Sequence, residues 1–129
     1  MKTLRVILAL SLVVASVAAE KKKKPPDLEV LEASAHRDET KVSVDGRVRN
    51  TGEKPIKELT LLFDFRAPDK QVVATERGAI EEEVLQPGQE AAFHMETNTP
   101  PRSVSFQIGA ADGSGRELRV AKAGPFPVE

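Results

Sequence analysis

The side chains that could carry out acid–base or nucleophilic chemistry in this chain are few and scattered. His36 and His94 are the only histidines, and the chain has no cysteine. Catalysis by a Ser-His-Asp triad needs a histidine beside an activated nucleophile, and no G-x-S-x-G nucleophile elbow is present. Ser114 lies between two glycines, in a stretch typical of a hairpin loop. We therefore predict a protein that is not an enzyme, with no catalytic residues and no cofactor.

Two groups of residues could suggest a metal site. His94 and Met95 are potential copper ligands, but neighbours in a strand point to opposite faces of a sheet. We expect Met95 in the core and His94 on the surface. The glutamates at 81–83, even with Asp112, lack the oxygen spacing of a calcium loop. We predict that they belong to an edge strand whose charges discourage aggregation, and that the chain has no metal site.

The charge of the chain is unevenly distributed. The net charge is −1, but six of the 19 lysines and arginines precede Pro25, whereas 19 of the 20 acidic residues follow it. The part from Pro25 onward therefore carries −6. It also contains few aromatic residues, because the chain has five Phe, no Trp and no Tyr. An acidic domain without stacking platforms is a poor match for nucleic acid, so we predict no nucleic-acid partner.

These side chains would be positioned by β-strands. Four segments, 40–50, 58–66, 90–96 and 103–110, alternate apolar and polar residues with a period of two, as a half-buried strand requires. Shorter patterns at 27–37, 70–78, 79–85 and 116–122 are weaker strand candidates. The inward positions are expected to be Val42, Val44, Gly46, Val48, Leu59, Leu61, Phe63, Phe65, Ala91, Phe93, Met95, Val104, Phe106, Ile108 and Ala110.

Turn signals between these segments complete the prediction of the fold. Gln86-Pro87-Gly88-Gln89 suits a type II turn, and 112–115 suits a hairpin loop. Short strands with frequent turn signals are typical of an all-β sandwich. We predict an immunoglobulin-like antiparallel β-sandwich of about seven to eight strands over residues 28–122, followed by a C-terminal tail at 123–129.

The stretches 44–73 and 85–96 carry a resemblance to a known group of domains. The matching residues are Gly46, Val48, Asn50, Thr51, Gly52, Phe63, Leu85, Pro87, Gly88 and Phe93. In this pattern, residues 28–120 resemble the FxLYD-type and CARDB-like immunoglobulin-fold domains of exported prokaryotic proteins. Phe65, Arg66 and Ala67 replace the Leu, Tyr and Asp of the name-giving motif, and Lys70 replaces a turn glycine. The resemblance implies an extracytoplasmic accessory or interaction module without known catalysis.

The first 27 residues predict where the chain resides. A positively charged start, the apolar run Val6–Ala19 and the small residues at its end form the three parts of a secretory signal peptide. A run of 14 residues, broken by Ser11 and Ser16, is short for a permanent membrane span. We predict a signal helix at 1–19, cleaved after Ala18 or Ala19, and a disordered arm rich in Lys and Pro at 20–27. The protein would be exported, to the periplasm or the exterior, with no stable membrane span after cleavage.

These patterns favour a non-catalytic binding or structural module whose partner is another envelope protein or a polymer. The alternative is a small periplasmic carrier or chaperone for a metal, peptide or lipid. If segments 58–66, 90–96 and 103–110 shared one sheet, their outward residues would form one partner surface. The predicted surface contains Leu62, Asp64, Arg66, His94 and Glu96, with Leu62 as an apolar docking point ringed by charges.

Overall fold

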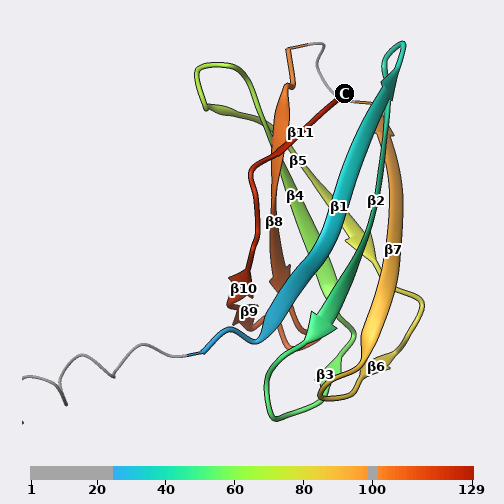
Figure 1. Ribbon diagram of the computed structural model, residues 1–129, viewed down its shortest axis with the longest axis vertical. Coiled ribbons are helices and arrows are strands. Elements are labelled where there is room, and N and C mark those ends of the chain that lie inside the picture. Colours follow the sequence, from blue (N-terminus) through green and yellow to red (C-terminus); the bar gives the residue numbers. More distant parts are fainter. Residues whose placement is uncertain (1–24, 99–101) are drawn as a thin grey trace, which may run out of the picture.

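A computed structural model describes residues 25–98 and 102–129 of the chain (Figure 1). Every regular element in these residues is a β-strand. The predicted signal helix, its cleavage site and residues 20–24 of the predicted arm lie outside the described residues. Within the part of the chain that is described, no helix is long and apolar enough to span a membrane.

In the described residues, six strands have seven or more residues, and five short strands have two residues each. The long strands are β1 (Leu28–Asp38), β2 (Lys41–Asn50), β4 (Thr60–Arg66), β5 (Val72–Ala79), β7 (Glu90–Asn98) and β8 (Ser105–Ala111). The short strands are β3 (Ile56–Lys57), β6 (Val84–Leu85), β9 (Glu117–Leu118), β10 (Val120–Ala121) and β11 (Phe126–Pro127). The sequence predicted about seven to eight strands, because two-residue strands are too short to show a period.

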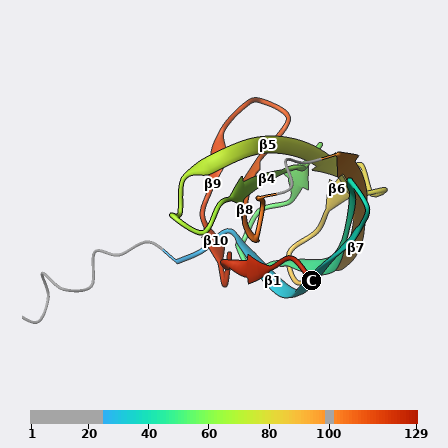
Figure 2. The same ribbon diagram turned by 90° about the horizontal axis from the view of Figure 1, so that it is seen from above.

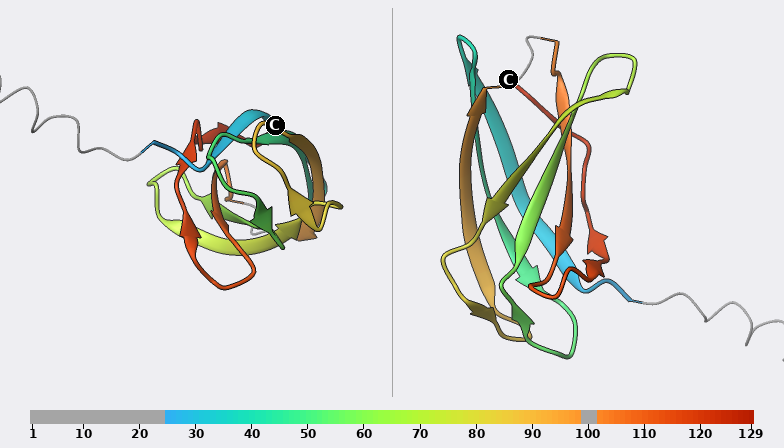
Figure 3. Two further views of the ribbon diagram at one scale, coloured as in Figure 1. Left: turned by 90° about the horizontal axis from the view of Figure 1, so that it is seen from below. Right: turned by 180° about the vertical axis from the view of Figure 1, so that it is seen from behind.

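The strands form two sheets packed face to face. One sheet has the order β10-β1-β2-β7 and the other has the order β11-β8-β4-β5, with β9 also pairing to β8. The views along the strands show the two layers enclosing one core (Figures 2 and 3). A separate pair, β3 and β6, lies at one end. This architecture confirms the prediction of an all-β, immunoglobulin-like antiparallel sandwich.

The alternation of apolar residues in the sequence correctly predicts most of the core. Phe63 and Phe65 on β4 are fully buried, and Phe93 on β7 is 5% exposed. The ring of Phe63 joins the two sheets, because its centroid lies 5.7 Å from that of Phe93 on β7 and 6.3 Å from that of Phe106 on β8. Tilted ring pairs at these separations are favourable contacts, so the phenylalanines fix how the sheets pack.

The prediction that segment 90–96 shares a sheet with 58–66 and 103–110 is wrong. The segment forms β7, which pairs with β2 in the opposite sheet, with His94 opposite Asp45. β4 does pair with β8, as predicted. A period of two tells which residues face the core but not which sheet a strand joins, because either sheet buries the same alternate positions.

Two further strand predictions are corrected. Glu81, Glu82 and Glu83 lie in the connection between β5 and β6 rather than in an edge strand. β8 begins only at Ser105, and before it the alternation fails, since Val104 is 42% exposed whereas Ser103 is buried. The N–H of Val104 donates to the carbonyl of Arg66, so the backbone stays attached to β4 while the two side chains exchange their expected faces.

The segment predicted as a C-terminal tail is part of the fold. Within 123–129, β11 pairs with β8, and Glu129 exchanges backbone hydrogen bonds with Ala35 and Arg37 on β1, so this segment is bonded to both sheets. The ring of Phe126 packs on Phe106 with centroids 5.3 Å apart. Asp27, predicted to end the arm, is also held, because its carboxylate accepts the N–H of Arg119 at 2.9 Å. These contacts close the edge between β1 and β8.

The opposite edge is formed by β5 and carries two features that discourage further pairing. A β-bulge lies between β5 and β4 at Phe65 and Arg66. Glu76 pairs with Phe63, so its carboxylate-bearing side chain is on the face turned toward the core. Bulges and inward-pointing charges are common ways of protecting an edge strand from aggregation. The faces of the sheets, rather than this edge, are therefore the better candidates for binding.

Candidate functional site

The outer face of the β5–β4–β8 sheet carries three of the five predicted partner residues. Leu62, Asp64 and Arg66 alternate with buried neighbours on β4 and are each half-buried, so they point outward as predicted. Leu62 is flanked by Arg77 on β5 and by Gly109 on β8. A glycine beside the leucine leaves one side of its side chain uncovered.

A hollow of about 430 Å³ lies on this face and includes Leu62. We call it the Leu62 hollow. It is lined by Glu58, Thr60, Leu62, Arg77, Ala111, Asp112, Gly113 and Gly115. Three of its four members on β8 and in the following hairpin, Ala111, Gly113 and Gly115, have a short side chain or none, so the lining is shallow there. A Cβ atom on Gly109, beside the hollow, would have only the Cβ of Leu62 within 4 Å, at 3.8 Å, so that position is open.

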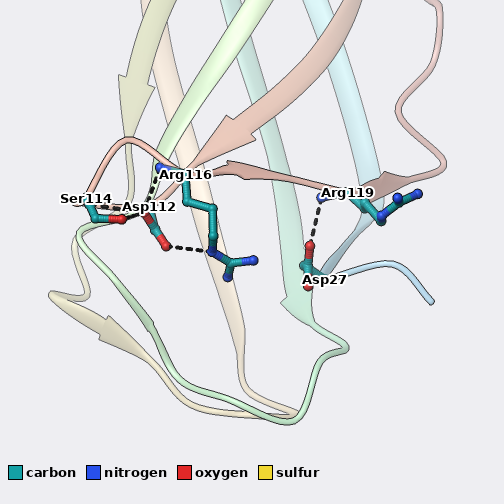
Figure 4. Close-up of polar contacts among 5 residues, drawn as sticks. All are labelled: Asp27, Asp112, Ser114, Arg116 and Arg119. Carbon is teal, nitrogen blue, oxygen red and sulfur yellow. Dashed lines mark hydrogen bonds and ion pairs between the residues drawn. The ribbon is translucent and has the colours of Figure 1, made fainter. Parts of the chain in front are cut away.

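One wall of the Leu62 hollow is the β8–β9 hairpin, which Asp112 holds together (Figure 4). Its Oδ1 accepts the Ser114 hydroxyl at 2.7 Å and the backbone N–H groups of Ser114 and Arg116, each at 3.0 Å. Its Oδ2 accepts Arg116 Nε–H at 3.2 Å. These bonds, chiefly that from the Ser114 hydroxyl, lower the pKa of Asp112 below its usual value of 3.8. The carboxylate therefore braces the hairpin, and its oxygens are already occupied.

Glu58, beside this hairpin, also lines the hollow and has an unusual backbone conformation. Its φ of 51° lies in the left-handed region, which costs a residue other than glycine on the order of 1–2 kcal/mol. Two bonds hold this conformation: Glu58 N–H donates to the Glu83 carbonyl, and Gly113 N–H donates to the Lys57 carbonyl, each at 2.9 Å. The Glu58 carboxylate lies over Gly113, where a Cβ would come within 2.5 Å of its Oε2. Such strain is often found where a side chain has a function.

No pattern in the sequence indicates that Glu58 belongs to a site. Left-handed residues are usually predicted from Gly or Asn, and the surrounding Ile-Lys-Glu-Leu contains neither. Arg77 was also missed, because the segment 70–78 was only a weak strand candidate. Neither Glu58 nor Arg77 has an ion-pair partner within residues 25–98 and 102–129. The Leu62 hollow thus has an apolar floor between a free carboxylate and a free guanidinium.

The other two predicted partner residues, His94 and Glu96, lie on the outer face of the opposite sheet. His94 Nδ1 is 2.5 Å from Asp45 Oδ1, and His94 Nε2 is 3.5 Å from Glu96 Oε2. Glu96 is also 3.5 Å from the ammonium of Lys41. The hydrogen bond and charge of Asp45 raise the pKa of His94 above its usual value of 6.5. The prediction of one surface joining these residues to Leu62 is therefore wrong.

A second hollow, of about 630 Å³, extends from His94 toward the β5–β6 connection. Its lining includes four carboxylates, those of Glu32, Asp45, Glu81 and Glu82. Nowhere in residues 25–98 and 102–129 do three or more His, Asp or Glu side chains lie close enough together to hold a metal ion. Carboxylates gathered in this way form an acidic surface, and nothing in their geometry specifies a ligand.

A third hollow, of about 830 Å³, lies beside the Asn50-Thr51-Gly52 loop. Asn50 is 1% exposed, and all of its side-chain bonds go to the protein's own backbone. Its amide donates to the carbonyls of Lys54 and Leu85, and its oxygen accepts Gly52 N–H, each at 2.9 Å. Removing a buried amide with this many bonds would leave several backbone groups unpaired. This loop is therefore explained by folding rather than by ligand binding.

Comparisons with known proteins agree with the fold. No family model matches the sequence, and no curated protein is significantly similar to it. Among solved structures, the chain is similar to IrmA from Escherichia coli, with 11% identity over 79% of this chain and 95% of that one and a TM-score of 0.50. It is also similar to the C-terminal domain of Wzt, with 10% identity over 81% and 79% of the two chains and a TM-score of 0.51.

A third similar structure is a β-glucuronidase of glycoside hydrolase family 2, with 14% identity and a TM-score of 0.55. The match covers 79% of this chain but only 13% of the glucuronidase. A Bacteroides uniformis β-glucuronidase is likewise matched over 13% of its length. Identities this low show a shared β-sandwich fold and nothing about activity. The resemblance to FxLYD-type and CARDB-like domains stays a prediction.

Proposed function

We propose that the chain is an exported, non-catalytic binding module of the cell envelope, and that it docks its partner on the outer face of the β5–β4–β8 sheet. The observation that carries the proposal is the Leu62 hollow, where an outward-facing leucine lies in a concave surface between charged walls. An apolar residue within a polar rim is the arrangement that concentrates binding energy in protein interfaces. The partner would be another envelope protein or a polymer.

The shape of this face suits a protein partner. Thr60, Ala111 and Gly109 surround Leu62 with short or absent side chains, so a partner's side chain can approach the sheet closely. On the β8 side of Leu62 no long side chain has to be displaced, which keeps the entropic cost of docking low there. The hairpin wall is braced by Asp112, so the shape is set before binding.

The size of the Leu62 hollow favours a second candidate function, that of a small carrier or chaperone. A volume of about 430 Å³ falls within the range of small-ligand sites, which is about 300–1,000 Å³. Charged walls suit a peptide better than a lipid chain, because a lipid would leave both charges without a partner. Saturable uptake of one ligand, without an envelope partner, would favour the carrier.

The experiment that tests the binding module is a pull-down from envelope fractions with matched leucine variants. Leu62→Glu places a charge on the floor of the hollow, whereas Leu31→Glu makes the same change at an exposed leucine on β1 of the other sheet. We expect Leu62→Glu to lose the partner and Leu31→Glu to keep it, with both folded by circular dichroism. Equal retention by the two variants would remove this face as the docking surface.

A further inference from the structure

The two charges that border the Leu62 hollow have opposite sign: Arg77 lies on β5, across from Leu62, and the Glu58 carboxylate lies over Gly113 in the hairpin that follows β8. We propose, as an inference that rests on the proposed function, that the hollow binds an extended peptide segment. In this segment an apolar residue lies between a basic and an acidic residue. Glu58 would select the basic residue and Arg77 the acidic one. Both side chains line the hollow, and neither has an ion-pair partner in the described part of the chain.

The spacing of the two charges fits a short extended segment. Glu58 precedes Leu62 by four residues, which span at most about 14 Å. Arg77 lies directly across from Leu62 in the β4–β5 ladder. In an extended peptide, residues i and i+2 are about 7 Å apart. When the apolar residue rests on Leu62, a basic and an acidic residue two positions to either side therefore lie within reach of the flexible side chains of Glu58 and Arg77.

The environment of Glu58 explains why it can discriminate between ligands. Its left-handed backbone is held by the bond from Glu58 N–H to Glu83 and by the neighbouring bond from Gly113 N–H to Lys57, so the backbone that carries the carboxylate is fixed when the protein folds rather than when a ligand arrives. Preorganisation of this kind lowers the entropic cost of binding. Asp112, the other carboxylate in the lining, is bonded within its own hairpin and does not compete for the basic residue.

Charge complementarity also excludes ligands that carry only one sign of charge. A peptide with two basic residues would place one of them against Arg77, and a peptide with two acidic residues would place one against Glu58. Like charges brought together on a surface are repelled, and this repulsion gives selectivity beyond the attractive contacts. The hollow should therefore rank peptides of equal length and apolar content by their charge pattern.

The test uses four capped pentapeptides as probes, KGLGE, KGLGK, EGLGE and KGAGE, titrated into the isotopically labelled full chain and followed by NMR. We expect KGLGE to bind about fivefold more tightly than either peptide of a single charge sign, as expected for exposed ion pairs. KGAGE should bind more weakly than KGLGE because it lacks the apolar contact. The amides that shift should be those of β4, of β8 and of residues 112–115.

Charge variants of the protein make the test specific. Arg77→Glu should make KGLGK the tightest probe, and Glu58→Gln should reduce the preference for KGLGE over EGLGE. Glu58→Gly provides a second variant that keeps the fold, because glycine adopts a positive φ readily. Equal affinity for all four probes, or an unchanged ranking in Arg77→Glu, would overturn the inference. If the peptide ranking failed but Leu62→Glu still lost the partner in the pull-down, the proposed docking function would stand and only the inference about peptide charge would be wrong.

Discussion

The substitution Gly46→Ala tests the packing between the strands most sharply. Gly46 lies on β2 opposite Phe93 on β7. A Cβ atom built on Gly46 would lie 2.3 Å from the carbonyl oxygen of Glu32 and 2.3 Å from Cζ of the Phe93 ring. The first contact is with backbone, so it cannot be relieved by turning a side chain. Gly46 is therefore required by close approach rather than by its backbone angles.

The expected effect of this substitution follows from two opposing terms. Overpacking of a core costs up to about 3 kcal/mol, whereas replacing glycine by alanine gains up to about 1 kcal/mol by restricting the unfolded chain. We expect Gly46→Ala to lower the free energy of unfolding by about 2 kcal/mol. Gly109→Ala is the matched control, because its nearest contact would be an ordinary 3.8 Å, and it should be neutral or stabilise by up to about 1 kcal/mol.

Urea unfolding followed by far-UV circular dichroism measures both variants, since the chain has no Trp or Tyr to report by fluorescence. The midpoint of Gly46→Ala should fall by about 1–2 M urea. In a Phe93→Ala background the same substitution should cost less, because one of the two clashes is gone. A midpoint unchanged or raised in Gly46→Ala would show that the Phe93 ring does not lie over this position and that the β2–β7 register is wrong.

Three further predictions concern the ends of the chain and His94. Deleting residues 126–129 should lower the free energy of unfolding by about 3 kcal/mol or more in the same urea assay, because it removes the Phe126 ring and the bonds to both sheets. An unchanged urea midpoint would show that these residues are a tail that does not stabilise the fold. An NMR titration should give His94 a pKa above 6.5 that falls in Asp45→Asn. The pairing of protonated His94 with Asp45 stabilises the fold fully below pH 6.5. Because the folded pKa of His94 is raised, this stabilisation is lost as the pH rises through the folded pKa. A measured pKa at or below 6.5 would contradict the pairing. Mass spectrometry of the protein from its native host should find an N-terminus within one residue of Ala19, whereas an intact chain in the soluble cytoplasm would argue against export.

The core could be predicted because burial leaves a periodic trace in the sequence. Every second residue is apolar from 61 to 65 on β4 and from 91 to 95 on β7, and the structure buries Leu61, Phe63, Phe65, Phe93 and Met95 as expected. The period does not encode which sheet a strand joins, and for this reason β7 was placed beside β4. Because of this one error, His94 and Glu96 are predicted on the outer face of the wrong sheet.

The Leu62 hollow could be predicted only in part. Leu62 stood out as an apolar residue at an outward position, and the structure confirms its direction. The walls depend on long-range contacts, since the Glu58 backbone is held by Glu83 and by the hairpin at Gly113. Likewise, β10 and β11 bond to different sheets within a few residues, and two-residue strands leave no alternation to detect.

Hydrogen exchange of the chain with and without its captured partner is the most direct test of the proposed binding face. If the partner docks on the Leu62 hollow, amides of β4, of β8 and of the hairpin at 112–115 should exchange more slowly in the complex, while amides of β2 and β7 keep their rates. Slower exchange confined to β2 and β7, around the pair formed by His94 and Asp45, would contradict the account and move the binding surface to the opposite sheet.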